Sequence, residues 1–308
     1  MQQRFSCPSC LSILPAIVKV EGSLDKHTSF EQINNAWIGI GKSSHFSYYE
    51  CQVCGTLCNK DYPDLGELSR LYSSMPPNMA EAVSLKDQSR NQLSYARVIV
   101  DHASLIGVRN NPLSILELGA DCGLLLAAIV DLLPQKASNM VAIEPNLEVH
   151  YELKERINQL AVNATCFVDL KDLPDNQPEL FDIIAAVHVF DHVFDIGSLL
   201  KDLASKLSPR GFIFFVVHNP QSSVASLLGR KWPPYCAQHP QLFTRNGSAA
   251  LAKGAGLKLV KSGRTINHFS LSMVTDFLGL KLPLVDRIPL MVPLGNRYYI
   301  LEHDEVIK

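Results

Sequence analysis

The sequence has no hydrophobic run long enough to cross a membrane. Its longest one, from Leu124 to Leu133, is interrupted by Asp131, and it has about half of the ~20 residues that a membrane-spanning helix needs. Residues 1–7 contain no apolar stretch of the kind found in secretion signals. We therefore expect a soluble, cytoplasmic protein that is not attached to a membrane.

A strong net charge is also missing. The 308 residues include 28 basic and 30 acidic side chains, which leave a net charge of -2. Nucleic-acid binding draws most of its affinity from basic side chains on phosphates, so this balance argues against RNA or DNA as a partner. Hydrophobic residues make up 47% of the chain, which is enough for a packed core and too much for a disordered chain.

Cysteine is concentrated at one end of the chain. Five of the eight cysteines lie in the first 62 residues, and four of them form two C-x-x-C pairs, Cys7 with Cys10 and Cys51 with Cys54. Disulfides are rare in cytosolic proteins, whereas four thiolates complete the tetrahedral coordination of zinc. We expect these four cysteines to form a closed, structural zinc site, with buried free thiols as the alternative. Cys58 breaks the spacing and is left out.

The sequence pattern along the whole chain predicts three domains. Residues 1–62 form the zinc-binding module, and residues 63–112 read as a helical connector with helices at 64–72 and 79–107. From residue 113 to residue 308 strands alternate with helices, which predicts an α/β domain with a parallel sheet. The predicted strands are 114–118, 140–143, 166–168, 182–187, 212–217, 257–260 and 297–301, and the predicted helices are 124–133, 146–160, 197–207 and 244–254.

A possible cofactor site follows the first of these strands. Gly119 and Gly123 let the backbone pass close to a ligand. Glu117 would repel a pyrophosphate but tolerates a cation such as an ammonium or sulfonium group, and the dinucleotide pattern G-x-G-x-x-G is broken by Asp121. Glu144, at the end of the second strand, suits the hydroxyls of a ribose. These residues favour a cationic cofactor over a dinucleotide.

Residues 113–218 resemble the core of class I S-adenosylmethionine-dependent methyltransferases. Their glycine motif, E/D-x-G-x-G-x-G, is matched at Glu117, Gly119 and Gly123, and this sequence departs from it at Asp121. The resemblance implies a Rossmann-like, seven-stranded methyltransferase sheet with helices on both faces, and S-adenosylmethionine as the cofactor. It implies cofactor contacts from Glu117, Gly119, Asp121, Gly123, Glu144, Asp169, Leu170 and Tyr72.

The two cysteine pairs extend the resemblance to a zinc-bearing bacterial subgroup. This subgroup includes deoxysugar C-methyltransferases and methyltransferases of polysaccharide and natural-product pathways. Trp232, His239 and the residues 242–244 resemble the subgroup's segment after the fifth strand. The resemblance implies C- or O-methylation of a small molecule, such as a nucleotide-linked sugar or a biosynthetic intermediate.

Two histidines are candidates for a catalytic base. Methyl transfer is an in-line displacement that depends on alignment, and a base is needed where the acceptor must lose a proton. His239 lies beyond the fifth strand, where the resemblance implies a histidine that takes this proton; ordering of the loop is the alternative. His192 follows the fourth strand, where it could also cap a helix. Asp191, His188 and His218 are weaker candidates.

Two other functions stay open at this point. One is an RNA methyltransferase with an N-terminal zinc module, which the near-neutral charge disfavours. The other is a non-catalytic protein that keeps the methyltransferase fold, and Asp121 in place of a glycine is the feature in its favour. The sequence leaves the identity of the acceptor, the methylated atom and the oligomeric state open.

Overall fold

The structure is a computed structural model that describes residues 1–37, 44–73, 84–108, 113–133, 137–160, 163–174, 180–270, 289–293 and 295–304. The chain forms two compact units, each assembled from separated segments. Unit 1 comprises Met1–Met75, Ile184–Gly263 and Gly295–Lys308, and unit 2 comprises Pro76–Ile183 and Arg264–Leu294. The predicted boundaries at 62 and 112 stay predictions. Within the described ranges, no helix is both long and apolar enough to cross a membrane.

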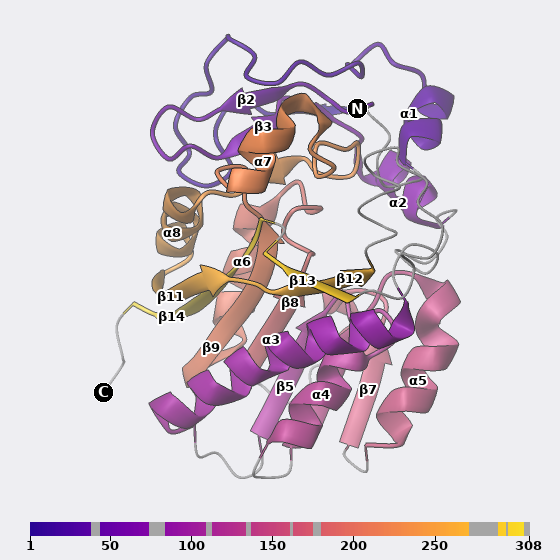
Figure 1. Ribbon diagram of the computed structural model, residues 1–308, viewed down its shortest axis with the longest axis vertical. Coiled ribbons are helices and arrows are strands. Elements are labelled where there is room, and N and C mark those ends of the chain that lie inside the picture. The colour runs from indigo at the N-terminus through magenta and orange to yellow at the C-terminus, as the bar shows by residue number, and fades with distance from the viewer. Residues whose placement is uncertain are drawn as a thin grey trace. The chain divides into compact units, whose positions relative to one another are not determined.

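A seven-stranded sheet with the strand order β11-β14-β9-β8-β5-β6-β7 is the main element of the fold (Figure 1). Strands β5, β6 and β7 run parallel to one another, and β14 runs antiparallel to β9. The predicted α/β class with a seven-stranded sheet is confirmed. The strands are β5 Leu113–Leu118, β6 Ala137–Ile143, β7 Asn163–Phe167, β8 Phe181–Val187, β9 Leu207–His218, β11 Leu257–Arg264 and β14 Asn296–His303.

Unit 2 carries three helices over its strands. Figure 1 shows α3, α4 and α5 on one face of β5 and β7. Every side chain of β5 is buried, as expected for a parallel strand covered by helices. The helices are α3 Leu85–Ile106, α4 Leu124–Leu132 and α5 His150–Asn158, with short 3-10 turns η1 Leu147–Val149 and η2 Leu170–Asp172. A hairpin of β12 Asn267–Ser270 and β13 Pro289–Val292 completes the unit, and it was not predicted.

Unit 1 combines the cysteine-rich segment with segments from the second half of the chain. Its small antiparallel sheet has the order β10-β3-β2, in which Gln241 pairs with Cys58. The small strands are β1 Gln2–Gln3, β2 Tyr48–Glu50, β3 Leu57–Asn59, β4 Asp61–Tyr62 and β10 Gln241–Leu242. The helices are α1 Phe30–Trp37, α2 Leu65–Ser73, α6 Ile196–Ser205, α7 Ser223–Leu228, η3 Gly229–Lys231 and α8 Arg245–Gly254.

Candidate active site and metal centre

The loop between β5 and α4 adopts backbone conformations that glycine favours. The φ angles of Gly119, Asp121 and Gly123 are 66°, 47° and 78°. Aspartate is one of the few other residues that enters this left-handed region readily, so Asp121 takes the conformation expected of the motif's missing glycine. A Cβ atom at Gly123 would lie 2.9 Å from Leu153 Cδ1, so a larger residue would displace that side chain, in addition to the strain of the positive φ angle.

Glu144 ties this loop to the end of the next strand. Its Oε2 accepts a hydrogen bond from the backbone N–H of Asp121, and its Oε1 accepts one from Asn146, both at 2.8 Å. The backbone N–H of Gly119 also donates to the carbonyl of Ile143 at 2.8 Å. Each carboxylate oxygen has a second lone pair, so Glu144 keeps the capacity to accept from the hydroxyls of a ribose.

Glu117 is buried without a complete set of partners. It is 2% exposed, and its Oε2 has no hydrogen-bond partner within the described segments. Burial, and next the nearby Glu144, raise the pKa of Glu117 well above its ordinary value. A buried carboxylate is unfavourable unless it is paired. The unpaired oxygen is free to pair with a cationic ligand, and the predicted contact of Glu117 with the cofactor stays a prediction.

Asp169 and Leu170 follow the third of these parallel strands. Asp169 caps η2, where its Oδ1 accepts from the backbone N–H of Lys171 at 3.0 Å. The backbone N–H of Glu144 donates to the carbonyl of Phe167 at 2.9 Å. The residues after β5, β6 and β7 thus meet at the edge where the parallel strands end, which is where α/β proteins bind nucleotides.

Arg156 is a residue of this site that the sequence did not single out. Its Nε donates to the carbonyl of Cys122 at 2.6 Å, so α5 holds the loop before α4 from the side. An arginine 34 residues from its partner gives no local sequence signal. Only the packing of α5 reveals it.

Five titratable side chains gather in unit 1. The imidazole ring centroids of His188 and His218 are 4.6 Å apart, those of His218 and His239 are 4.9 Å apart, and those of His192 and His239 are 4.6 Å apart. Asp191 belongs to the same cluster and is 0% exposed. The structure therefore unites both predicted bases with the three weaker candidates.

The hydrogen bonds of this histidine cluster fix two imidazole tautomers. Asp191 Oδ2 accepts from His218 Nδ1 at 2.7 Å and from the His218 backbone N–H at 3.0 Å. The carbonyl of Pro234 can only accept, so His239 Nδ1 donates to it at 2.8 Å. Both histidines therefore keep a lone pair on Nε2. Burial lowers the pKa of His239 to about 4 and raises that of Asp191 to about 6.

Tyr72 lies in unit 1 beside His192. Its hydroxyl is 3.5 Å from His192 Nδ1, and its ring meets the ring of Trp37 edge-on with centroids 5.5 Å apart. These contacts connect α2 to the histidine cluster. The contact with the cofactor that the resemblance implies for Tyr72 stays a prediction.

The turn that carries Asp191 and His192 is held by two residues that the sequence analysis missed. Gln241 Nε2 donates to the carbonyls of Phe190, at 2.9 Å, and of Val193. Arg4 donates to Gln241 Oε1 at 3.0 Å and to the carbonyl of Phe194 at 2.7 Å. Because Arg4 and Phe194 are 190 residues apart, no local pattern could have connected them.

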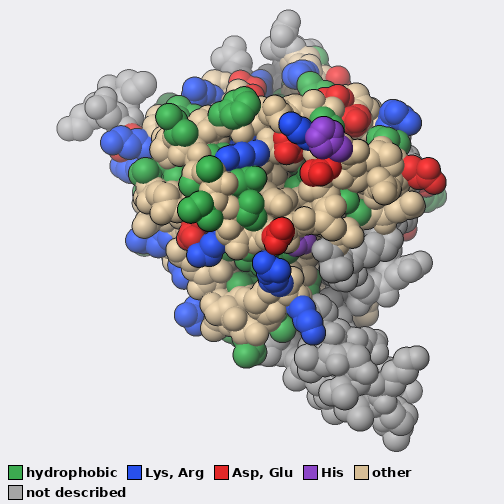
Figure 2. All heavy atoms as spheres, turned by 90° about the horizontal axis from the view of Figure 1, so that it is seen from above, with side chains coloured by type: hydrophobic (Ala, Val, Ile, Leu, Met, Phe, Trp, Pro, Cys, Tyr) green, Lys and Arg blue, Asp and Glu red, His purple; other side chains and the backbone are tan. Residues whose placement is uncertain are grey.

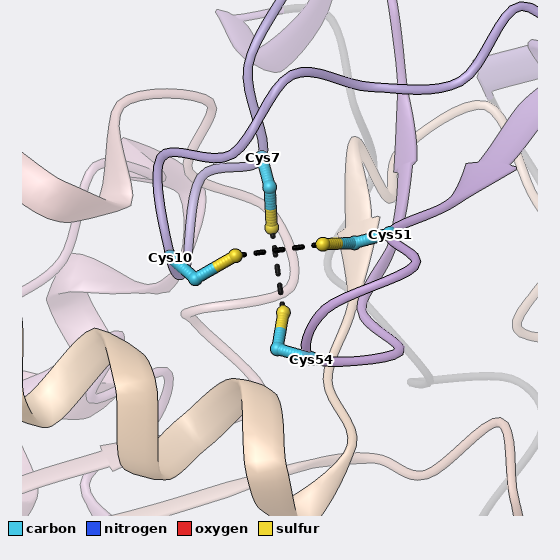
Figure 3. Close-up of side chains that lie close together, drawn as sticks. All are labelled: Cys7, Cys10, Cys51 and Cys54. Atoms are coloured by element: carbon cyan, nitrogen blue, oxygen red, sulfur yellow. Dashed lines mark hydrogen bonds between the residues drawn. The ribbon is translucent and has the colours of Figure 1, made fainter.

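The four cysteines predicted as ligands lie together and point their sulfur atoms at one another (Figure 3). The Sγ atoms of Cys7 and Cys54 are 3.5 Å apart, and those of Cys10 and Cys51 are 3.4 Å apart. These distances are too long for disulfides and close to the about 3.8 Å between sulfur ligands of tetrahedral zinc. The donor set therefore fits zinc. Cys58 lies outside the group and points to the carbonyl of Tyr49.

Residues 88–262 match the model of a protein family described as a methyltransferase domain. The ubiquinone biosynthesis O-methyltransferase of Neisseria meningitidis serogroup A is 25% identical over 167 residues, which cover 53% of this chain and 66% of that protein. The chain thus spans just under two thirds of this relative. The protein of the same name from Xanthomonas euvesicatoria is 26% identical over 227 residues, which cover 71% of this chain and 84% of that protein.

A comparison with solved structures also returned methyltransferases. One is the magnesium protoporphyrin IX methyltransferase from Synechocystis PCC 6803 with bound SAH. It has 13% sequence identity and a TM-score of 0.48, and the match covers 71% of this chain and 86% of that one.

Proposed function

The chain belongs to the family of proteins with this methyltransferase domain, and we propose that it transfers a methyl group from S-adenosylmethionine to a small hydroxylated molecule. The observation that carries the proposal is the buried Glu117, whose Oε2 lacks a partner among the described residues. It lies at the end of β5, next to the strand that leads to Glu144. A nucleoside with a positively charged tail satisfies both carboxylates.

Several of the predicted cofactor residues have a defined role in this proposal. Glu117 pairs with the cationic amino acid end, and Glu144 accepts from the ribose hydroxyls. Asp169 and Leu170 flank the adenine. The cofactor contact of Tyr72, which lies in unit 1, rests on the resemblance alone. Once bound, S-adenosylmethionine supplies a methyl group on a sulfonium, which makes it the electrophile of the reaction.

We assign the base to His239. Burial lowers its pKa to about 4, so its ring is neutral near pH 7 and Nε2 can accept a proton. His239 Nε2 would take the proton of the acceptor hydroxyl, and the cofactor would supply the methyl group to the acceptor oxygen. His192, packed edge-on at 4.6 Å, positions the ring of His239.

A small molecule is the acceptor that the relatives favour. Two of them are named as O-methyltransferases of ubiquinone biosynthesis, which supports a hydroxyl group on a biosynthetic intermediate. On the face seen in Figure 2, basic side chains are scattered among acidic and hydrophobic ones rather than joined in one basic surface, and this disfavours RNA. The four-cysteine cluster favours a second candidate, C-methylation of a nucleotide-linked sugar, because the subgroup that the sequence resembles carries such a cluster.

Zinc is the metal that we propose for Cys7, Cys10, Cys51 and Cys54. Four protein ligands leave no open position, so the ion would be structural. Its place in unit 1 is next to α8, because Thr244, the cap of this helix, donates to the carbonyl of Cys54 at 2.6 Å.

The test is transfer of a radioactive methyl group from S-adenosylmethionine to two panels of acceptors, hydroxylated aromatic compounds and nucleotide-linked sugars. We expect the radioactive methyl group to be transferred to an oxygen atom of compounds in the first panel. His239→Gln should slow transfer by about 10²- to 10⁴-fold and leave cofactor binding unchanged, whereas the exposed His27→Gln serves as the unaffected control. Label on sugar carbon would favour the second candidate. Label on RNA, with neither panel labelled, would refute a small-molecule acceptor.

A further inference from the structure

The histidine cluster contains a second set of metal-binding side chains. One ligand atom from each of His188, Asp191 and His218 lies within 4.8 Å of the other two. We propose that these three side chains bind a divalent first-row transition metal ion, separate from the zinc of the cysteines. The site lies wholly within unit 1.

The donor set selects the class of metal. Two imidazole nitrogens and one carboxylate oxygen suit zinc, iron, cobalt or nickel better than magnesium or calcium, which prefer oxygen ligands. Three protein ligands also leave at least one coordination position open, as in catalytic rather than structural zinc sites. The four-cysteine cluster has neither property, so the two sites differ in chemistry.

Two atoms of the set lack partners. Among the residues that the structure describes, His188 Nδ1 and Asp191 Oδ1 are buried without a hydrogen bond. Asp191 is fully buried, and an unpaired oxygen on a buried carboxylate is costly. A cation bound between these atoms satisfies both of them, and no existing hydrogen bond of either atom has to break.

The side chain of His218 is already aligned with the carboxylate of Asp191. His218 Nδ1 and Asp191 Oδ2 are 2.7 Å apart and share a proton. A metal ion takes the place of that proton, which either leaves to the solvent from Asp191 or moves to His218 Nε2, so that a neutral imidazole and an ionised carboxylate remain as ligands. The backbone N–H of His218 keeps its bond to Asp191 Oδ2 at 3.0 Å, which holds the carboxylate in place.

His188 is held in an uncommon conformation at this site. Its φ angle is 55°, and left-handed backbone at a residue other than glycine is found mainly where the surroundings enforce it, often at functional sites. Its backbone N–H donates to the carbonyl of Val216 at 2.9 Å. Asn296 Nδ2 lies 3.3 Å from His188 Nε2. For Nδ1 to bind the metal, the ring proton is carried on Nε2, and the Asn296 amide turns so that its oxygen accepts this proton.

The open position gives this metal a role in the proposed reaction, and this step rests on the proposed function. A hydroxyl group bound to a divalent metal ion loses its proton far more readily than in water. The proton goes to His239, whose ring lies 4.9 Å from that of His218. The ion would thereby select acceptors with a hydroxyl group that can bind a metal.

Cobalt(II) is the probe that separates the two metal sites. The metal-free full-length chain is titrated with cobalt, and bound cobalt is counted by elemental analysis. Cobalt bound to four thiolates shows an intense thiolate-to-metal charge-transfer band, whereas cobalt bound to imidazole and carboxylate shows only weak visible bands. We expect two equivalents in the wild type, one with and one without the charge-transfer band.

Two variants locate the second equivalent. Asp191→Asn keeps the shape of the side chain, and His188→Asn keeps a residue that tolerates positive φ. Both should bind one equivalent and retain the charge-transfer band, which also reports that unit 1 is folded. His27→Gln, an exposed histidine outside the cluster, should still bind two.

A wild type that binds a single equivalent, with the charge-transfer band, would overturn the proposal. Asp191 and His218 would then be a pair that shares a proton and nothing more. A second equivalent that survives both variants would equally refute the assignment of the ligands. Two equivalents in the wild type and loss of the second one in both variants, in a protein that methylates neither panel, would leave this site standing while the proposed function fails.

Discussion

At the scale of single residues, our proposal depends most on the buried carboxylate of Glu117. Its burial and the neighbouring Glu144 both oppose ionisation and raise its pKa. The free protein therefore keeps a proton on Glu117 over a range of pH in which an unfolded chain has lost it. A bound cation lowers the pKa of Glu117, because it favours the ionised form of the carboxyl group.

Glu117→Gln should abolish proton release on cofactor binding. In the wild type, the ammonium or sulfonium group lowers the raised pKa of Glu117, so binding releases up to one proton and tightens as the pH rises toward that raised pKa. Calorimetric titration in two buffers of different ionisation enthalpy measures this release. Glu148→Gln, at an exposed position, is the matched control, and a variant at Glu117 that releases as much as the wild type would exclude the role.

The same group makes the free protein less stable at higher pH. A folded-state pKa above the unfolded value means that the folded state binds more protons, so the contribution of Glu117 to stability is present below its unfolded pKa and is lost as the pH rises through the folded value. The pH dependence of urea unfolding should therefore become flatter in Glu117→Gln over that interval.

At the scale of elements, the sequence predicted the strands and helices around the large sheet because hydrophobic strands such as β5, β8 and β9 alternate with helical segments. It missed α1, the β12–β13 hairpin and the pairing of β10 with β3, since these are short and depend on distant partners. The candidate site residues divide in the same way, into those with a local sequence motif and those that depend on distant partners. The C-x-x-C spacing and the motif at Glu117 were visible, whereas the bond of Asp191 to His218 and the contacts of Arg4 were not.

The backbone conformation of the loop between β5 and α4 can be tested by substitutions at Asp121. Asp121 has a φ angle of 47°, which glycine adopts without strain, so Asp121→Gly should leave stability within about 1 kcal/mol of the wild type. Asp121→Val should lower it by about 1–3 kcal/mol, because a β-branched side chain is strained there. Urea unfolding measures both, and equal losses in the two variants would show that the aspartate side chain, not the backbone, sets the stability.

Helix α8 is joined to the cysteine cluster through its cap. Thr244 Oγ1 accepts from the backbone N–H of Gly247 at 3.0 Å and donates to the carbonyl of Cys54 at 2.6 Å. Thr244→Val keeps the volume and loses both bonds, and it should cost about 1–3 kcal/mol in the free energy of unfolding. Thr244→Ser keeps the hydroxyl and should lose less than half as much; a valine variant as stable as the wild type would contradict this.

At the scale of the whole molecule, unit 1 is assembled from three separated parts of the chain. The cysteine-rich segment pairs with β10 and is bonded to Thr244, and Arg4 supports the turn of Asp191. A metal at the cysteines would thus stabilise the surroundings of the histidine cluster as well as residues 1–62.

Removal of zinc by a chelator should therefore loosen more than the N-terminal segment. Hydrogen exchange is expected to accelerate at residues 1–62 and also around β10 and α8, because the two regions share hydrogen bonds. Cys58→Ser should retain the metal and the protection. Faster exchange confined to residues 1–62 would show that the metal has only a local effect.

We propose that the edge at which β5, β6 and β7 end binds S-adenosylmethionine. Calorimetric titration of the purified chain should show one saturable equivalent with a dissociation constant in the range of about 1 μM to about 1 mM. Glu144→Ala should weaken binding at least about tenfold, equivalent to about 1.4 kcal/mol, whereas Glu148→Ala should not change it. Absence of saturable binding at millimolar cofactor would contradict the claim.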